Sequence, residues 1–572
     1  MATLAEAAYL ALEKKFSEAA DVALEAAHSV DKRQPVSKAA YETYAAAGKF
    51  YQMAGNPLAA MAAFDHCFEI FDRIILAQAN LNFVITHLTI WPELFARAAL
   101  AALDDGQPMR AIDYAETGRA RLTGNMINQL SRPGNADKRS WDEYASLWRN
   151  LASCLTNNLY KGQKSGKTER ELIEKLKRAR KGLIDSGVER KALLPVSDVV
   201  VTEQLIKQLS DSGLPPTVLV YVISLDEEIF RPVLVSEKGA FEINLTKQEQ
   251  KQILTSAHRF NQRITGNNGY AQLEDALDEL MENCGPELRM LFRQIGKDHK
   301  NKRIYWIPHG ELVTVPISAI PMDNENKVLG DEHAIQVAPS LAMASRSIGA
   351  HLKRIVKTSV YIEGRVESGK AETGGGVSLL TPVAKEVKKY KPKDCHALST
   401  ALASADLALF SCHGVFDWRD PLDGFIELGF DFKIKDLLEQ KYFPDTLVVL
   451  NTCDAGTVAQ DETNEPVGIP IAMLASGAQT VIGPSQPIAS IAGVSFCYFF
   501  FKSLANGFAS PEAVQESIKQ LRRISRSTLS ECLAEAGHPF AGRISKYNSD
   551  QPAFNKRCYW AFFQHWGGDW RT

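Results

Sequence analysis

Two segments, DLALFSCHG (residues 406–414) and TLVVLNTCDAG (residues 446–456), decide the fold of this chain. Each begins with a short apolar run and ends in polar residues and glycine. A continuous apolar run of this length is typical of a strand that is buried on both faces of a parallel sheet. Similar runs at 303–307, 359–362 and 480–482 alternate with helical patterns, so this half of the chain is predicted to be α/β.

The residues that directly follow these two strands predict the chemistry. His413 and Gly414 follow the first strand, and Cys453 follows the second strand 40 residues after the histidine. One crossover helix accounts for that distance, so the strands can be neighbours with their carboxyl ends at one edge. A neighbouring imidazole raises the thiolate share of a cysteine. We therefore predict that Cys453 is a nucleophile, that His413 is its general base, and that the backbone N–H groups of Gly414 and Cys453 form an oxyanion hole.

Further polar residues at this edge are predicted to line a substrate pocket: Asp417, Asn451, Asp454 and Ser485. Taken singly, a strand histidine or cysteine is more often a core residue than a catalytic one. An acyltransferase or another thiol enzyme would use the same His413 and Cys453 pair with a different acceptor. No cofactor or metal is predicted, because the cysteines show neither a CxxC motif nor a Cys/His ligand spacing.

The first 130 residues are rich in alanine and predict successive amphipathic helices. The segment YAAAGKFYQMAGNPLAAMAAF matches the offsets of a tetratricopeptide repeat (TPR) with Tyr44, Gly48, Tyr51, Ala60 and Phe64. Small residues at 48 and 60 would let two helices touch, and the three aromatic rings would fill the gaps. We predict a TPR-like domain over 1–130, with an ordinary helical bundle as the alternative. Such platforms bind polypeptides on their concave face.

The chain after residue 130 is predicted to contain a connector and one large domain. Residues 131–214 are polar and basic, and an apolar stripe predicts an amphipathic helix with Leu172, Ile173, Leu176, Ala179 and Leu183. Residues 215–572 form the predicted sheet domain, divided into 215–350 and 351–572. It starts with a predicted hairpin, and its aromatic-rich last 45 residues are expected to pack back on the sheet.

Composition excludes several classes of protein. The chain has 572 residues, of which 45% are hydrophobic and 23% charged, as in soluble globular proteins. Lys plus Arg is 65 and Asp plus Glu is 68, so no basic excess indicates direct contact with nucleic acid. Nine cysteines are few for this length and fit a reducing compartment. Neither a signal peptide nor an apolar run of about 20 residues is visible, so we expect a cytoplasmic protein that is not bound to a membrane.

Several segments together resemble the CHAT domain family, caspase-like cysteine peptidases that often follow tetratricopeptide repeats. The resemblance is carried by LALFSCHGVFDWRDPLDGFIEL, TLVVLNTCDAGT and PVGIPIAMLASGAQTVIGPSQPI. The upstream IYWIPHGELVTVPISAI and QVAPSLAMAS and the terminal YWAFFQHWGGDW agree in order and spacing. The resemblance covers about residues 215–572 and implies a fold of class α + α/β, a TPR-like helical domain followed by a caspase-like sheet domain.

This resemblance implies a cysteine endopeptidase with His413 as general base and Cys453 as nucleophile, which cleaves a specific partner protein. It further implies that an activating protein or ribonucleoprotein binds the TPR-like domain. Proteins that look like this one act in bacterial antiviral defence, either with type III CRISPR effectors or by cleaving gasdermin-like pore formers. Asn451 and Thr452 depart from the Ala or Ser that the family often has before the cysteine. The alternative is a catalytically silent TPR–CHAT scaffold that assembles a signalling complex.

Overall fold

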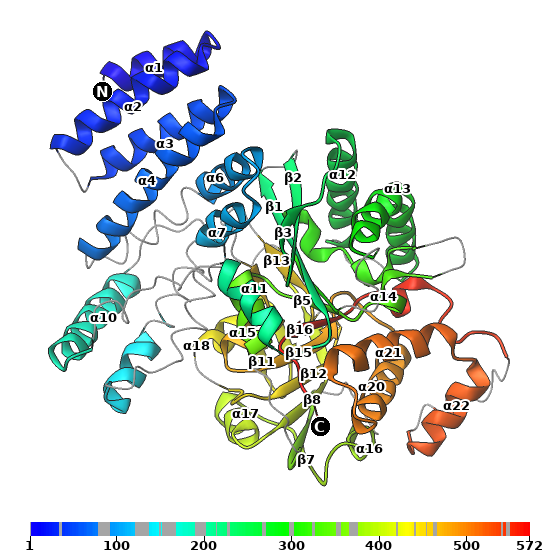
Figure 1. Ribbon diagram of the computed structural model, residues 1–572. Coiled ribbons are helices and arrows are strands. Elements are labelled where there is room, and N and C mark those ends of the chain that lie inside the picture. The colour runs from blue at the N-terminus through cyan, green and yellow to red at the C-terminus, as the bar shows by residue number, and fades with distance from the viewer. Residues whose placement is uncertain are drawn as a thin grey trace.

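In the computed structural model the described residues are 2–33, 37–77, 92–119, 136–147, 150, 167–188, 202–212, 214–225, 229–265, 270–296, 303–322, 327–349, 356–364, 376–418, 421–439, 442–453, 455–460, 466–538, 541–544 and 550–571. They form a helical arm (α1 to α7), a separate helix pair and an α/β body. In Figure 1 the arm lies at the upper left, the helix pair at the lower left and the body on the right.

One 11-stranded sheet runs through the α/β body in the order β3-β2-β1-β4-β5-β16-β15-β12-β8-β6-β7. Its strands are β1 (Thr217–Leu225), β2 (Ile229–Ser236), β3 (Gly239–Glu242), β4 (Arg303–Ile307), β5 (Ile335–Val337), β6 (Thr358–Glu363), β7 (Glu386–Tyr390), β8 (Leu407–Ser411), β12 (Leu447–Asn451), β15 (Thr480–Pro484) and β16 (Phe563–Gly567). The pairs β1/β2, β2/β3 and β15/β16 are antiparallel, and the other neighbours are parallel. The predicted strands are therefore present, in a sheet that is mixed.

The C-terminal strand β16 lies in the middle of this sheet. It pairs antiparallel with β15 and parallel with β5, and all five of its residues are buried. The expectation that the last residues pack back on the sheet was wrong in this respect, because the segment FQHWG becomes part of the sheet itself. Residues 215–350 and 351–572 consequently contribute strands to one continuous sheet.

The apolar run of β1 is buried because helices cover both faces of the sheet. Val218, Val220 and Val222 face one core with α12 (Lys247–Ile264) and α13 (Tyr270–Gly296). Leu219 and Tyr221 face a second core on the opposite side, which includes residues of α6, α11 and α15. Because successive strand residues alternate between faces, an entirely apolar strand is what such a sandwiched sheet requires.

The second half of the body adds further short elements. The helices are α14 (Leu329–Glu332), α15 (Leu341–Gly349), α16 (Gly376–Leu380), α17 (Cys395–Leu402), α18 (Ile434–Glu439), α19 (Ile469–Ala475), α20 (Ser490–Ala505), α21 (Ser510–Arg523), α22 (Arg526–Glu535) and α23 (Ala541–Ile544). Two small sheets are β9 (His413–Val415), β10 (Phe425–Glu427) and β11 (Asp431–Lys433), and β13 (Val458–Gln460) with β14 (Pro466–Gly468). The short 3₁₀ helices are η2 (Gly310–Thr314), η3 (Ile317–Ala319), η4 (Pro421–Asp423) and η6 (Arg557–Tyr559). The small sheets flank the carboxyl ends of β8 and β12.

The helical arm consists of helices that pack on their sequence neighbours: α1 (Ala2–Leu12), α2 (Phe16–Arg33), α3 (Lys38–Met53), α4 (Pro57–Ala77), α6 (Pro92–Asp104) and α7 (Pro108–Gly118). Three turns of the arm each contain one residue with positive φ: Lys14, Gly55 and Gly106. The predicted contact is present, since a Cβ at Gly48 would lie 2.6 Å from the buried ring of Phe64. The assignment to tetratricopeptide repeats stays a prediction.

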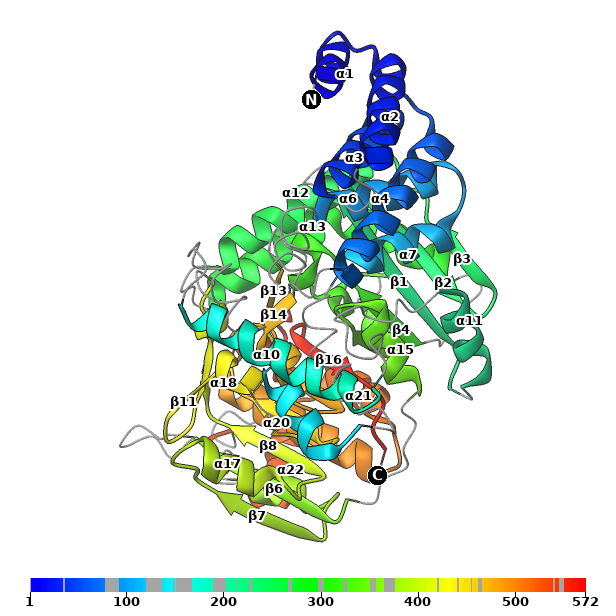
Figure 2. The same ribbon diagram turned by 90° about the vertical axis from the view of Figure 1, so that its left-hand side faces the viewer.

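The arm is attached to the β1 end of the sheet. In α7, Glu116 accepts the N–H of Ala342 at 3.1 Å, which caps α15. Arg119 donates to the Val222 carbonyl at 2.6 Å and lies over the Tyr221 ring. Figure 2 shows the arm at one end of the molecule and β7 at the other. The arm is therefore fastened to the part of the sheet that is remote from β8 and β12.

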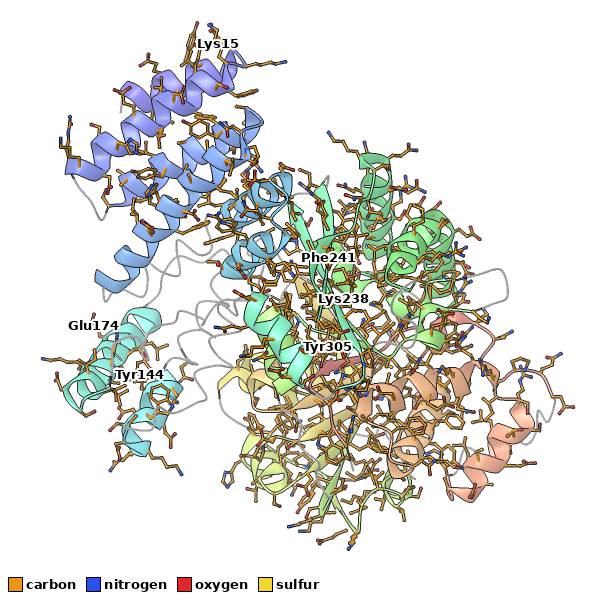
Figure 3. The ribbon with its side chains drawn as sticks, in the orientation of Figure 1. Lys15, Tyr144, Glu174, Lys238, Phe241 and Tyr305 are labelled. Atoms are coloured by element: carbon orange, nitrogen blue, oxygen red, sulfur yellow. The ribbon has the colours of Figure 1, made fainter. Side chains whose placement is uncertain are left out.

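A separate helix pair contains α10 (Lys167–Asp185) and residues 138–147. Leu176 and Leu183 of the predicted stripe are buried against Trp141 and Tyr144. Figure 3 shows Glu174 and Tyr144 on these two helices, away from Tyr305 in the large sheet. α11 (Thr202–Asp211) then leads into β1. No helix among the described residues has the length and apolar character needed to cross a membrane.

Candidate functional site

The register between β8 and β12 brings the two predicted catalytic residues to one level. The parallel ladder ends at the pair Ser411 and Asn451. His413 and Cys453 each follow two residues beyond that pair. β15 lies on the other side of β12, so the two residues emerge at the carboxyl edge in the middle of the second half of the sheet. This is the arrangement that the spacing of 40 residues predicts.

A bend at Cys412 separates β8 from β9. The Cys412 sulfur lies 3.3 Å from the Thr452 hydroxyl, and Gly364 leaves room for its side chain. Burial is the main reason that the pKa of Cys412 is raised to about 12. A thiol with so high a pKa is almost fully protonated at neutral pH and is a poor nucleophile. Cys412 is therefore a packed neighbour of the site.

Gly414 touches the loop that carries the cysteine. A Cβ at position 414 would collide with the Cys453 carbonyl oxygen and lie 2.7 Å from Cγ2 of Thr452. Only glycine allows the two backbones to approach so closely. The backbone N–H groups predicted for the oxyanion hole thus belong to two segments that are in contact.

The cysteine loop is held by hydrogen bonds to the segment after β15. The Gly456 N–H donates to the Pro484 carbonyl at 2.8 Å, and the Thr457 hydroxyl donates to the Ser485 carbonyl at 2.6 Å. Cys453 is half-buried, and its sulfur lies 3.5 Å from the Ile488 carbonyl oxygen. The loop continues into the β13–β14 hairpin, which packs on η2. The loop that carries Cys453 is therefore held both by the end of β15 and by the hairpin that follows it.

His413 is exposed on β9. Among the described residues no hydrogen bond joins its imidazole to the Cys453 thiol. Catalytic hydrogen bonds are often long in enzymes without substrate and shorten only in the substrate complex. The two residues lie at the ends of neighbouring strands.

The predicted pocket residues have different surroundings. The Asn451 amide donates to the Ser411 hydroxyl at 3.4 Å, and its side chain also contacts Gly493. Ser485 is buried and donates to the Phe562 carbonyl at 3.3 Å. Asp417 is half-buried two residues after β9. Asp454 lies outside the described residues. Asn451 and Ser485 therefore lie beside the segment that carries Cys453, and Asp417 follows the segment that carries His413.

Sequence reasoning missed Glu427, which lies directly opposite His413 in the β9/β10 pair. The only signal for it was the apolar–polar alternation of FIEL, which indicates a strand but not its partner. Two other acids near the site each contact two lysines. Asp423 lies 3.2 and 3.1 Å from Lys433 and Lys435, which together lower its pKa. Glu363, at the end of β6, contacts Lys389 and Lys391 at 3.0 and 2.6 Å.

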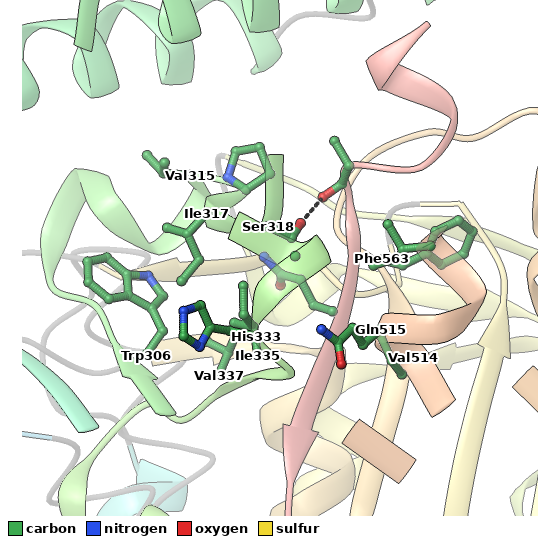
Figure 4. A pocket seen from close by; sticks show the side chains of 15 residues that line it. Trp306, Val315, Ile317, Ser318, His333, Ile335, Val337, Val514, Gln515 and Phe563 are labelled. Atoms are coloured by element: carbon green, nitrogen blue, oxygen red, sulfur yellow. Dashed lines mark hydrogen bonds between the residues drawn. The ribbon is translucent and has the colours of Figure 1, made fainter. Parts of the chain in front are cut away.

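A small pocket of about 30 Å³ lies among residues of β4, β5, α21 and β16 (Figure 4). Its lining is largely apolar, and Ser318 at its wall donates to the Ala561 carbonyl at 3.1 Å. Neither His413 nor Cys453 lines it, so the cavity is separate from the candidate site. Within the described ranges no group of three His, Cys, Asp or Glu side chains is arranged to hold a metal ion.

Comparison with known proteins yields one family and a set of solved structures. The family model of the CHAT domain matches residues 274–568, more than half of the 572 residues. No curated protein sequence matches the chain. Crystal structures of the Saccharomyces cerevisiae separase–securin complex at 3.0 and 2.6 Å resolution are similar to it, with TM-scores of 0.43 and 0.40 and identities of 9% and 10%. These matches cover 96% and 97% of this chain and 48% and 50% of the other chain, so this chain spans about half the length of its structural neighbours.

Proposed function

This chain belongs to the CHAT domain family, a caspase-like protease family, and on that premise we propose that it is a cysteine endopeptidase that cleaves a specific partner protein. Cys453 is the nucleophile and His413 the general base. The proposal rests on the strand register. His413 and Cys453 each lie two residues beyond the last residue pair of the neighbouring strands β8 and β12, and Gly414 contacts the Cys453 backbone.

The chemistry follows from these positions. His413 takes the proton of the Cys453 thiol, the thiolate attacks the substrate carbonyl, and the imidazolium returns the proton to the leaving amine. The N–H groups of Gly414 and Cys453 hold the negative oxygen of the tetrahedral intermediate. Water then hydrolyses the acyl-enzyme and releases the second product.

Cleavage of a candidate partner protein by the full chain tests this proposal. The wild type should cut the partner, whereas Cys453→Ala and His413→Ala should not. Cys532→Ala is the matched control, because Cys532 is a half-buried cysteine on α22. Equal cleavage by all four proteins would remove the assignment.

Thiol alkylation gives a test that needs no substrate. Burial raises the pKa of five described thiols, Cys67, Cys284, Cys412, Cys497 and Cys558. The half-buried Cys395 and Cys532 are the described competitors of Cys453. Iodoacetamide should label Cys453 well ahead of both, and labelling at equal rates would contradict an activated nucleophile.

Regulation is proposed to come through the helical arm. Division of the chain into a TPR-like arm, a connector and a peptidase domain would let an activating protein or ribonucleoprotein bind residues 1–130. The buried contacts of Glu116 and Arg119 with α15 and β1 support a mechanical link from arm to sheet. A role in bacterial antiviral defence, beside a type III CRISPR effector or on a gasdermin-like substrate, stays a prediction. Full-rate cleavage by a chain without residues 1–200 would remove the proposed gating.

A catalytically silent scaffold is the second candidate. It is favoured by the contact of the Cys453 sulfur with the Ile488 carbonyl oxygen and by the exposed position of His413. In that case Cys453→Ala would assemble the same complex as the wild type and neither protein would cut any component of it.

A further inference from the structure

The last strand of the large sheet, β7, has one side without a partner strand. It pairs in parallel with β6, and in the described part of the chain no strand pairs with its other side. Figure 2 shows β7 at the lower margin of the body, beyond β6 and β8. Backbone N–H and C=O groups along such an edge can pair with an added extended chain. The outer side of β7 is therefore a place where a peptide can lengthen the sheet.

Lysines dominate β7 and the loop that follows it, EVKKYKPK (residues 386–393), which we call the β7 edge. Its four lysines all reach solvent: Lys388, Lys389, Lys391 and Lys393. Glu386 lies 3.4 Å from Lys388. The carboxylate of the buried Glu363 is shared by two of the others, Lys389 at 3.0 Å and Lys391 at 2.6 Å. Four positive charges thus face two negative ones, so the β7 edge keeps an excess of positive charge.

The β7 edge lies at the same end of the sheet as the candidate site. The strands β7, β6, β8 and β12 are parallel, and Glu363 at the end of β6 is paired in register with Ser411 at the end of β8. Neighbouring strands are about 4.8 Å apart, so β7 lies about 14 Å from β12, the strand that leads to Cys453. An extended chain covers that distance with about four residues.

The loop of the β7 edge also contacts the small sheet that contains β9. A Cβ at Gly429, between β10 and β11, would lie 2.6 Å from the Pro392 carbonyl oxygen. The two neighbours of Pro392, Lys391 and Lys393, are both exposed. The next residue, Asp394, is turned toward α17, where it accepts the Ala397 N–H at 2.8 Å. The two exposed lysines therefore lie beside the segments that surround the candidate site.

We propose that the β7 edge binds an extended acidic segment of a protein partner. The segment adds to the outer side of β7 as a further strand, and its Asp and Glu side chains pair with the lysines. Backbone pairing and charge pairing act together in this arrangement. The consequence for cleavage rests on the proposed function. In a substrate, the acidic residues would lie about four to six residues from the bond that Cys453 attacks.

Two other occupants fit the β7 edge less well. A second copy of the chain would bring the same lysines, and like charges on two edge strands prevent their pairing. Single-stranded nucleic acid matches the charge, but such ligands are held by exposed aromatic rings on which the bases stack. The one ring of the β7 edge, Tyr390, is half-buried against the core. An acidic peptide matches both the free strand edge and the charge.

Peptide binding tests the proposal without a known partner. The full chain with Cys453→Ala is titrated with a fluorescein-labelled nine-residue peptide of alternating Glu and Val, and binding is followed by anisotropy. This peptide should bind at least tenfold more tightly than a Gln–Val peptide or a Glu–Pro peptide. The Glu–Pro peptide keeps the charge but cannot donate to a strand ladder. No binding of the Glu–Val peptide, or equal binding of the Glu–Pro peptide or of a single-stranded RNA of equal charge, would overturn the inference.

Lysine variants locate the binding surface. Lys391→Gln combined with Lys393→Gln should weaken binding of the Glu–Val peptide about 3- to 10-fold, because two exposed charge pairs are lost. Arginine at both positions should retain binding. The matched control is Lys247→Gln combined with Lys251→Gln, at two exposed positions of α12. Equal weakening in the two glutamine variants would show that the peptide binds elsewhere.

Cleavage separates this inference from the proposed function. If the β7 edge binds the substrate, Lys391→Gln combined with Lys393→Gln should lower kcat/KM on the partner protein about 3- to 10-fold and leave kcat nearly unchanged. Peptide binding without any cleavage by the wild type would uphold the β7 edge and remove the peptidase. Cleavage by the wild type without peptide binding would remove the β7 edge and uphold the peptidase.

Discussion

Two strands of the large sheet end in the same dipeptide with different outcomes. β4 is followed by Pro308 and then His309-Gly310, and β8 is followed by Cys412 and then His413-Gly414. Gly310 has a φ of +55° and begins η2, on which the β13–β14 hairpin packs. Gly414 instead continues into β9 and contacts the Cys453 backbone. The turn after β4 thus contacts the hairpin that follows the cysteine loop, whereas the segment after β8 contacts the backbone of Cys453 itself.

The neighbouring strand decides this difference. β4 lies between β1 and β5, and β5 is followed by Ala338. β8 lies between β6 and β12, and β12 leads to Cys453. The His-Gly pair alone therefore does not distinguish the two strand ends. They differ in the residue that the adjacent strand brings to the same edge, and the role proposed for His413 depends on that residue being Cys453.

The largest expected effect separates the two histidines. His413→Ala should lower the cleavage rate by about 10³-fold or more, because general base and nucleophile act as a unit. His309→Ala should change the rate less than about threefold, since His309 precedes η2, which packs on the β13–β14 hairpin. Initial rates on one partner protein, at matched folded concentration by circular dichroism, check both. Equal losses in the two variants would contradict the division of roles.

The start of β4 is the site of the largest expected effect on stability. Arg303 is buried and binds both Glu512, at 2.5 Å, and Asp569. Arg303→Met should lower the free energy of unfolding by about 3–5 kcal/mol, because it leaves the buried carboxylate of Asp569, and that of the half-buried Glu512, without a positive charge beside it. Arg263→Met removes an exposed ion pair with Glu279 and should cost less than about 1 kcal/mol. Urea unfolding of the two variants gives the comparison, and similar costs would show that the Arg303 cluster is not structural.

The two glycines provide a finer test. Gly414→Ala should lower the cleavage rate about 100-fold, because its Cβ displaces the Cys453 backbone and small displacements of reacting groups are that costly. The Cβ that Gly310→Ala adds meets no atom within 4 Å, so the strain in this variant comes from the positive φ of residue 310. It should cost about 1–2 kcal/mol of stability and leave the rate nearly unchanged. A rate loss confined to Gly310→Ala would reverse the comparison.

The features that could be predicted from the sequence are local patterns, and those that could not be predicted depend on which strands pair over long distances in the chain. The apolar runs of β8 and β12 and the spacing of His413 and Cys453 are local patterns, and the strand pairing agrees with them. The central place of β16 could not be predicted, because an aromatic segment shows no period that identifies a strand partner. Glu427 was missed for the same reason, since only the β9/β10 register places it beside His413.

The most gradual expected effect concerns pH and β16, the strand that lies between the two halves of the sheet. His565 of β16 is fully buried and hydrogen-bonds the Ser510 hydroxyl at 2.8 Å. Burial is the main cause that lowers the pKa of His565 to about 3. The folded chain keeps this imidazole neutral, whereas the unfolded chain protonates it below about pH 6.5. The stability that it contributes is therefore complete above pH 6.5 and is lost progressively as the pH falls from 6.5 toward 3, by about 1.4 kcal/mol per pH unit.

Urea unfolding at pH 7, 6 and 5 should show this loss of unfolding free energy. His565→Gln should make the unfolding free energy depend less on pH, whereas His396→Gln, at an exposed position of α17, should leave the pH dependence unchanged. An unchanged slope in His565→Gln would mean that the imidazole is not held neutral in the junction between the two halves.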